Sequence, residues 1–315
     1  MKHRHSYMLI GACMATSLLS ACNDPEPKTE ADSALEQATI VAAMQDPIEV
    51  EIHSLDDLKT LFKEHNYDSK NWQNGNREIP RLSFAKIGER WAKSSQNLPV
   101  PVKKEVFFRL MAPLVLIANE KILLERQIIN NEAITSESLI ALARKYKVID
   151  ESALSLTQQQ KIELLERVDI MPPSLALAQS AEESGWGTSR FTREGNSFFG
   201  QWDFSGKGMV PKQQRKELGN YGLARFDSPL ASVEGYMLNI NTQRAYQKLR
   251  TLRAQLRADG KPISGLELAG TLDKYSERGQ AYIDSIREMI RYNKLQEVDK
   301  AYLSDDKLIH LKAPE

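Results

Sequence analysis

The sequence predicts a mostly helical α+β fold, in which a helical domain carries a small β-lobe and follows an N-terminal helical region. Two observations support this prediction. Apolar residues recur at three- and four-residue spacing, behind recognisable helix caps, in most segments after residue 53. Between Asn196 and Phe226 this period is lost and glycines and aromatic residues replace it, which is typical of a hairpin or small sheet.

Changes in composition and motif divide the chain into five segments. They are a signal peptide (1–21), an acidic spacer (22–52), an N-terminal helical region (53–160), a second region that holds the candidate chemistry (161–300) and a C-terminal tail (301–315). The part after the spacer is long enough to bury a substantial core.

The N-terminal residues predict export and lipid attachment. A basic start is followed by a short apolar stretch, Tyr7 to Leu19, which is too short to span a membrane. The sequence Leu19-Ser20-Ala21-Cys22 then resembles the lipobox of bacterial lipoproteins, so we expect cleavage before Cys22, a lipid on its sulfur and a periplasmic location. Asn23 in place of an acid favours the outer membrane by the same analogy. The alternative is an ordinary signal peptide with an incidental cysteine.

The net charge of zero conceals an uneven distribution. Residues 22–52 hold eight acidic residues and one basic residue, which indicates a solvated spacer. Residues 53–315 therefore carry 39 basic and 34 acidic residues, a mild positive excess that suits an anionic polymer. No concentrated basic stripe is present, so nucleic acid is not an expected partner.

Helix caps organise residues 53–160. Ser54 begins a capping box, and Ser136 and Thr157 can cap helices that run through Tyr146 and Arg167. Between them, residues 103–130 keep a helical apolar period. Pro113 lies inside this stretch, and we expect it to kink or divide the helix.

The second region begins with a helix rich in alanine and leucine. Pro172 and Pro173 suit its first turn, and Gly185 suits its end. The β-lobe follows, with a strand expected over 221–226. Further helices are expected from Ser228-Pro229, from Ser264 and over 280–294.

The distribution of histidine excludes several chemistries. No histidine lies between residues 66 and 309, so a Ser-His-Asp hydrolase or a Cys-His peptidase lacks its base and a zinc enzyme lacks its usual nitrogen ligands. No phosphate-binding glycine motif is present, and no metal or cofactor is required. Carboxylates, amides and aromatic residues remain, which is the equipment of a glycosidase.

Glu183 is the leading candidate for a catalytic acid. On a helix that starts near Pro173, Gln179 and Glu183 share one face, whereas Glu182 is turned about 100° away. Glu183 falls in the last turn, where the negative end of the helix dipole raises the pKa of a carboxyl group, and Trp186 could add apolar shielding. A raised pKa is what a general acid near neutral pH requires. The alternative is a surface glutamate at a helix end.

Four blocks of this region resemble one enzyme family. The first, Ala178 to Gly187, looks like the signature of the bacterial endo-β-N-acetylglucosaminidases of glycoside hydrolase family 73. Asn196 to Gly200 resembles the family's Asn-x-Phe-Gly turn, and the blocks at 225–236 and 272–286 follow in the family's order. Gly200-Gln201-Trp202 and the helical region upstream are most similar to the Bax-type members.

The resemblance implies a lysozyme-like fold with Glu183 as the general acid. The bond cut would join N-acetylglucosamine to N-acetylmuramic acid in a peptidoglycan strand. A second carboxylate is expected in the β-lobe, with Glu217 preferred over Asp203 and Glu194, although each could equally be a solvated loop acid. Without it, the 2-acetamido group of the substrate could act as the nucleophile.

The same resemblance assigns the remaining site residues. Tyr275 matches a family tyrosine that lines the cleft near the acid, with core packing as its alternative role. The expected substrate contacts are Gln179, Trp186, Asn196, Phe199, Trp202 and Tyr282. Aromatic residues at such positions often pack instead of binding, and for Trp186 we favour support of the turn that carries Glu183.

Two other functions remain open. A lytic transglycosylase would share the fold and the single glutamate, but the turn after Glu-Ser differs from that class. A catalytically inactive wall-binding lipoprotein is the second alternative, because the resemblance gives residues 53–160 no activity and their helices could dock an unknown protein partner.

Overall fold

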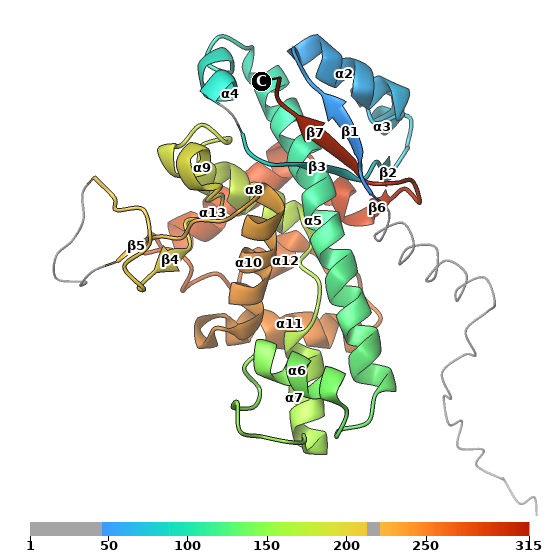
Figure 1. Ribbon diagram of the computed structural model, residues 1–315, viewed down its shortest axis with the longest axis vertical. Helices are drawn as coiled ribbons and strands as arrows, with labels where there is room; N and C mark the ends of the chain where they lie inside the picture. The colour runs from blue at the N-terminus through green and yellow to red at the C-terminus, as the bar shows by residue number, and fades with distance from the viewer. Residues whose placement is uncertain (1–45, 88, 213–220, 315) are drawn as a thin grey trace, which may run out of the picture.

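The computed structural model describes residues 46–87, 89–212 and 221–314 (Figure 1). Cys22 and Glu217 therefore lie outside the described residues. The helices are α2 (Leu55–Glu64), α3 (Ser69–Gln73), α4 (Glu89–Ser94), α5 (Val100–Asn131), α6 (Glu137–Lys145), α7 (Gln158–Arg167), α8 (Pro173–Ser184), α9 (Arg190–Gly195), α10 (Pro229–Thr242), η2 (Arg244–Tyr246), α11 (Gln247–Ala258), α12 (Gly265–Ala269), α13 (Gln280–Tyr292) and η3 (Leu295–Lys300). The strands are β1 (Ile48–Glu51), β2 (Glu78–Ile79), β3 (Leu82–Phe84), β4 (Trp202–Asp203), β5 (Gly222–Leu223), β6 (Tyr302–Leu303) and β7 (Ile309–Lys312). The mostly helical fold with a small β component is as predicted.

Most of the predicted helix starts are confirmed at the cap residue itself. The side chains of Ser54, Ser136, Thr157 and Ser228 each accept a hydrogen bond from a backbone N–H of the first turn that follows. Such caps satisfy donors that have no partner within the helix, and each typically contributes about 1 kcal/mol. These helices therefore begin where local chemistry favours them.

Helix α5 is the longest element and runs through the middle of the molecule (Figure 1). Of the two effects expected of Pro113, a kink or a division, the division is ruled out, because the helix is continuous over 32 residues. Pro113 is buried, and α8 and α10 pack along the helix, so tertiary contacts compensate for the lost hydrogen bond. No helix in the described part of the chain is both long and apolar enough to cross a membrane.

Short parallel strands join parts of the chain that are far apart in sequence. Strand β7 lies between β1 and β3, with Ile309 opposite both Ile48 and Leu82, and β6 pairs with β2. Three expectations are corrected here. The end of the acidic spacer forms β1, the N-terminal helical region contains β2 and β3, and the expected tail at 301–315 supplies β6 and β7.

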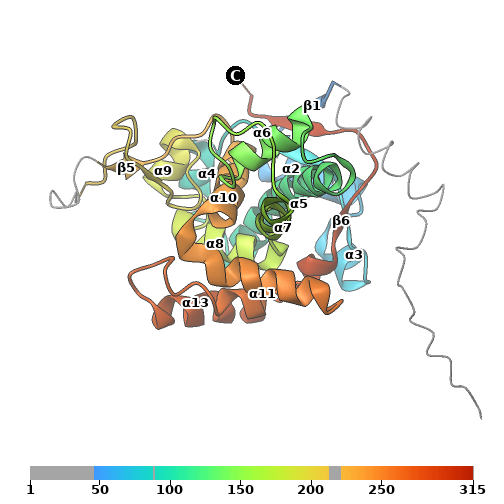
Figure 2. The same cartoon turned by 90° about the horizontal axis from the view of Figure 1, so that it is seen from below.

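The two regions on either side of residue 160 share one hydrophobic core. Buried residues from Leu58 in α2 to Leu311 in β7 form a single cluster that includes α5 and α8. Helix α8 packs against α5 and also against α12, α13 and η3. Figure 2 shows α11 and α13 along one side of the molecule and α5 nearer its middle. The N-terminal region is therefore part of the support for α8.

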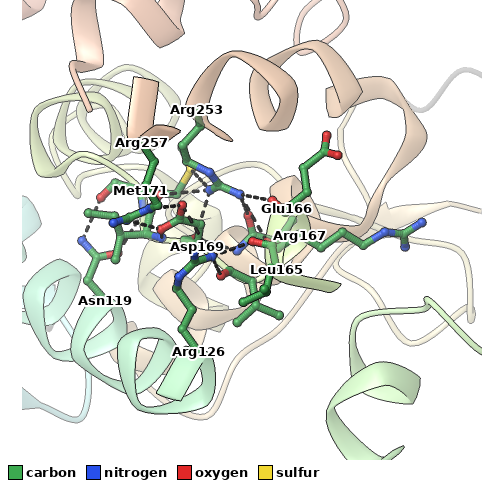
Figure 3. A network of polar contacts seen from close by, with 12 residues as sticks. Asn119, Arg126, Leu165, Glu166, Arg167, Asp169, Met171, Arg253 and Arg257 are labelled. Carbon is green, nitrogen blue, oxygen red and sulfur yellow. Dashed lines mark hydrogen bonds and ion pairs between the residues drawn. The ribbon is translucent and has the colours of Figure 1, made fainter. Parts of the chain in front are cut away.

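A buried ionic network fixes the segment that leads into α8 (Figure 3). Asp169 is 2% exposed, and its carboxylate accepts hydrogen bonds from Arg257 at 2.7 and 2.5 Å and lies 3.6 Å from Arg126. Arg253, which is fully buried, donates to the carbonyl oxygens of Asp169 and Ile170. Burial favours the neutral carboxyl, but the surrounding guanidinium groups outweigh it and hold the pKa of Asp169 below its usual value.

The same arginines also bind the end of α7. Arg253 donates to the carbonyl oxygens of Glu166 and Arg167, and Arg126 donates to those of Leu165 and Val168. Carbonyl groups at a helix C-terminus have no partner within the helix, and cations are favourable there. One network therefore joins α5, α7 and α11 to the segment that leads into α8.

Replacing Asp169 with alanine should destabilise the protein by about 3–5 kcal/mol, because it leaves buried guanidinium groups without their counter-charge. Urea unfolding at neutral pH measures this change. The matched control is Asp259→Ala, which removes a solvent-exposed ion pair with Lys261 and should cost less than about 1 kcal/mol. Equal effects of the two substitutions would contradict the role given to Asp169.

Candidate active site

Helix α8 is held at its N-terminus by residues from distant elements. Pro172 provides no side-chain cap, and Asp299 of η3 takes that role by accepting hydrogen bonds from the backbone N–H and the hydroxyl of Ser174, both at 2.7 Å. One turn earlier, the amide side chain of Asn119 pairs with the backbone N–H and C=O of Met171. A carboxylate at the positive end of the helix dipole is favourable.

The C-terminus of α8 is a tight turn, as predicted. Gly185 is left-handed (φ +55°), and its N–H donates to the carbonyl of Ala181. The hydroxyl of Ser184 donates to the carbonyl of Ser180 and accepts from the N–H of Gly187. Glu183 therefore sits in the last turn, on a backbone with little freedom to move.

Trp186 supports this turn through packing. It is left-handed (φ +61°), which costs energy in a residue other than glycine. Its ring lies edge-on against Phe107 and Phe108 of α5, with centroids 5.7 and 5.2 Å apart, and Lys104 lies 5.0 Å from the ring centroid. These contacts compensate for the strained backbone and favour a supporting role over direct sugar stacking.

Glu183 is a half-buried carboxyl group at the end of α8. Its Oε1 atom accepts a hydrogen bond of 2.9 Å from the hydroxyl of Tyr282. Its Oε2 atom faces the left-handed Gly200, where a Cβ atom would lie 3.4 Å away. A side chain at position 200 would therefore press on this oxygen, which explains a glycine at the entrance to the β-lobe.

Burial raises the pKa of Glu183 above its usual value. The hydrogen bond from Tyr282 and the charge of Arg278 act in the opposite direction, and the neighbouring Glu182 adds to the increase. Glu182 itself points away and forms an ion pair of 2.7 Å with Arg278, as its place on the helix predicts. The two adjacent glutamates therefore have different environments, and Glu183 has the one that favours a proton.

Tyrosines from two further elements surround the acid. Tyr275 stacks on Tyr282 with centroids 5.4 Å apart, and its hydroxyl donates to the carbonyl of Phe199. The ring of Phe199 stacks on Tyr236 of α10 at 4.0 Å. The structure thus places Tyr275 next to the acid's hydrogen-bond partner, where burial raises its own pKa well above the usual value.

Four of the expected substrate contacts are buried side chains. Gln179, Tyr282 and Phe199 are at most 2% exposed, and Asn196 is 8% exposed. The side-chain amide of Asn196 donates to the carbonyls of Ala85 and Phe226, which joins the β-lobe to the body. In this structure the four side chains therefore contact mainly other parts of the protein.

Trp202 is the most accessible of the expected contacts. It is 49% exposed on β4, parallel to the exposed ring of Phe204 and in contact with Tyr221. Strands β4 and β5 form the small lobe that leaves the body at α9 (Figure 1). This aromatic surface begins two residues after Gly200, the residue that faces Oε2 of Glu183.

The candidates for a second carboxylate differ in their surroundings. Glu217 lies outside the described residues. Asp203 accepts hydrogen bonds from the hydroxyl and the N–H of Ser205, which hold its pKa below the usual value. Glu194 is paired with Arg190 at 3.0 Å. Among the described residues, no group of three histidine, cysteine, aspartate or glutamate side chains is arranged to hold a metal ion.

Sequence reasoning missed several residues that shape the site. Tyr236, Asp299 and Arg278 contact residues of α8 that lie 57 or more positions away in sequence, and no local pattern connects them to Glu183. Tyr236 belongs to one of the four family-like blocks, which was the available signal. For Asp299 the sequence held no such signal, because this residue contacts α8 only in the tertiary structure.

Comparisons with known proteins identify related sequences. The family model described as mannosyl-glycoprotein endo-beta-N-acetylglucosaminidase matches residues 158–295. The chain is 31% identical to protein Bax of Escherichia coli (strain K12) over 201 residues, which cover 61% of this chain and 70% of that protein. No solved structure matches the chain.

The raised pKa of Glu183 predicts a pH-dependent effect of Glu183→Gln on stability. The neutral carboxyl favours the folded state below the pKa of the unfolded chain, and this contribution is lost as the pH rises through the higher pKa of the folded state. The free energy of unfolding of the variant relative to the parent should therefore increase with pH across this window. Urea unfolding at a series of pH values measures it.

The control is Ser180→Ala, which alters a buried, non-titrating side chain on the same helix. Its effect on the free energy of unfolding should not depend on pH. A Glu183→Gln difference that is constant or decreases with pH would contradict the assigned environment.

Proposed function

Because the chain belongs to the Bax-type glucosaminidase family, we propose that it is a peptidoglycan hydrolase with endo-β-N-acetylglucosaminidase activity. The bond cut is the β-1,4 linkage from N-acetylglucosamine to N-acetylmuramic acid. The observation that carries the proposal is Glu183, a half-buried carboxyl group with a raised pKa at the rigid end of α8, beside the β-lobe.

Glu183 acts as the general acid. It donates its proton to the glycosidic oxygen while the bond from the anomeric carbon to that oxygen breaks, so the leaving sugar departs as a neutral alcohol. A water molecule supplies the hydroxyl group that completes the new reducing end. Burial keeps a proton on Glu183 at a pH where an exposed glutamate has lost it.

The positive charge that develops on the sugar has two candidate partners. A lobe carboxylate, with Glu217 preferred and Asp203 as an alternative, would act directly, and its separation from Glu183 would then determine inversion or retention. The 2-acetamido group of the substrate would act instead if no lobe carboxylate comes close. We favour the substrate-assisted route, because Asp203 and Glu194 are already engaged by neighbouring groups.

Trp202 extends the proposed cleft along the glycan strand. Its exposed ring and that of Phe204 offer large, rigid apolar faces for sugar rings at low entropic cost. Binding energy gained away from the reacting bond can help to orient the substrate.

The bond specificity is tested by mass spectrometry of peptidoglycan fragments after digestion with the purified full chain. We expect reducing N-acetylglucosamine ends from the parent, and a loss of about 10²–10⁴-fold in rate for Glu183→Gln, the range attributed to a general acid. Glu182→Gln is the matched control and should keep most of the activity, because Glu182 is turned toward Arg278.

Each other outcome favours a different function. Anhydro-muramic ends would assign the chain to the lytic transglycosylases. Wall binding without cleavage by any variant would favour a binding lipoprotein. Full activity of Glu183→Gln would contradict the assignment of the acid.

We also propose that the protein is anchored in the periplasm, to the outer membrane, by a lipid on Cys22. The motif Leu19 to Cys22 supports this, and these residues lie outside the described part of the structure. Metabolic labelling with a radioactive fatty acid should mark the parent and not Cys22→Ser. Equal labelling of both would contradict the anchor.

A further inference from the structure

A directed chain of buried hydrogen bonds ends on one oxygen of Glu183. The hydroxyl of Tyr236 donates to Oε1 of Gln179 at 2.6 Å. The Nε2 atom of Gln179 donates to the hydroxyl oxygen of Tyr282 at 3.2 Å, and the hydroxyl of Tyr282 donates to Oε1 of Glu183 at 2.9 Å. The three side chains come from α10, α8 and α13.

The direction of this chain follows from the donors available. A hydroxyl group has one proton, and an amide has a fixed donor end and a fixed acceptor end. Because Nε2 of Gln179 occupies the oxygen of Tyr282, the proton of Tyr282 is directed toward Glu183. Gln179 and Tyr236 are fully buried, so water offers no alternative partner.

Two consequences follow for the carboxyl group of Glu183. An oxygen that accepts a hydrogen bond is a poor place for a proton, because the two hydrogens would compete for the same region. The proton of the neutral acid therefore resides on Oε2, which faces Gly200 at the entrance to the lobe. The chain of hydrogen bonds also stabilises the carboxylate of Glu183 that remains after it has donated its proton.

We propose that Gln179 and Tyr236 are positioning residues that act through Tyr282 to keep the catalytic proton of Glu183 on Oε2. The inference rests on the proposed role of Glu183 as the acid and adds which oxygen delivers the proton. Gln179 is thus required for the polarity of its amide, and a side chain of similar size without that polarity cannot replace it.

The other charged and titratable groups around Glu183 do not share this role. Glu182 and Arg278 form an ion pair on the outer side of α8, and Tyr246 and Tyr275 have no hydrogen bond to Glu183 among the contacts of the described chain. Their influence on Glu183 is electrostatic. They are unchanged in the variants below.

The experiment measures the pKa of Glu183 directly and does not depend on activity. The full chain is labelled with ¹³C at the glutamate side-chain carboxyl carbon and titrated by NMR, and the signal of Glu183 is identified by its absence in Glu183→Gln. Tyr282→Phe should raise the pKa by about one unit, because a hydrogen bond to the charged form is lost. Tyr236→Phe and Gln179→Met should raise it by smaller amounts.

Two controls separate positioning from general damage to the fold. Ser180→Ala lies on the same buried helix, one residue from Gln179, and should leave the pKa of Glu183 unchanged. In activity assays, the limb of kcat/KM that falls with rising pH should move to higher pH in Tyr282→Phe, in parallel with the NMR pKa. A structural defect alone would lower the rate without moving this limb.

The outcomes decide the proposal. An unchanged or lowered pKa in Tyr282→Phe overturns it, and so do Tyr236→Phe and Gln179→Met variants that both titrate like the parent. The protein could show the predicted pKa shifts by NMR and yet cleave no peptidoglycan. That result would support the chain of hydrogen bonds and reject the proposed function. Failure of Tyr282→Phe to fold leaves the other two variants to decide.

Discussion

The buried carboxylate of Asp169 and the three arginines around it are the constraint on which the rest of the structure depends. They join α5, α7 and α11 at the point where the chain enters α8. Asp299 and Asn119 then fix the first turn of the same helix. With its start held by six side chains and its end held by a left-handed turn, α8 presents Glu183 in one position. Burying a charged group costs desolvation free energy. Here that cost is offset by hydrogen bonds from the arginines to carbonyl groups at the end of α7, which also require partners.

Two opposing effects determine the protonation of Glu183. Burial favours the neutral acid, whereas the hydroxyl of Tyr282 favours the carboxylate. A more deeply buried acid would hold its proton too firmly to donate it, and a more exposed one would lose it to water before the substrate arrives. For the proposed acid, the tyrosine-rich surroundings would meet both needs, because they reduce its exposure to water and still supply a donor at one oxygen.

The sequence was informative where structure depends on near neighbours. The caps at Ser54, Ser136, Thr157 and Ser228, the end of α8 at Gly185 and the opposite orientations of Glu182 and Glu183 follow from local chemistry, and the structure agrees. It was uninformative for β1, β3 and β7, which are three or four residues long and pair across more than 200 residues, so no local period reveals them. The same limit applies within the site. Spacing placed Gln179 beside Glu183, but only the positions of Tyr236 and Tyr282 show that its amide is an internal link.

The parallel pairing of β1 with β7 has a mechanical consequence. The segment that precedes Ile48 enters the folded body along β1, and β1 contacts the body mainly through its hydrogen bonds to β7. A pull along the axis of β1 would load the four residue pairs of this ladder together, in shear. If the ladder gives way, β7 remains paired with β3, and α8 is untouched. If the proposed lipid on Cys22 holds the N-terminus, strain on it would be borne by the edge strand β1 and not by the elements around Glu183.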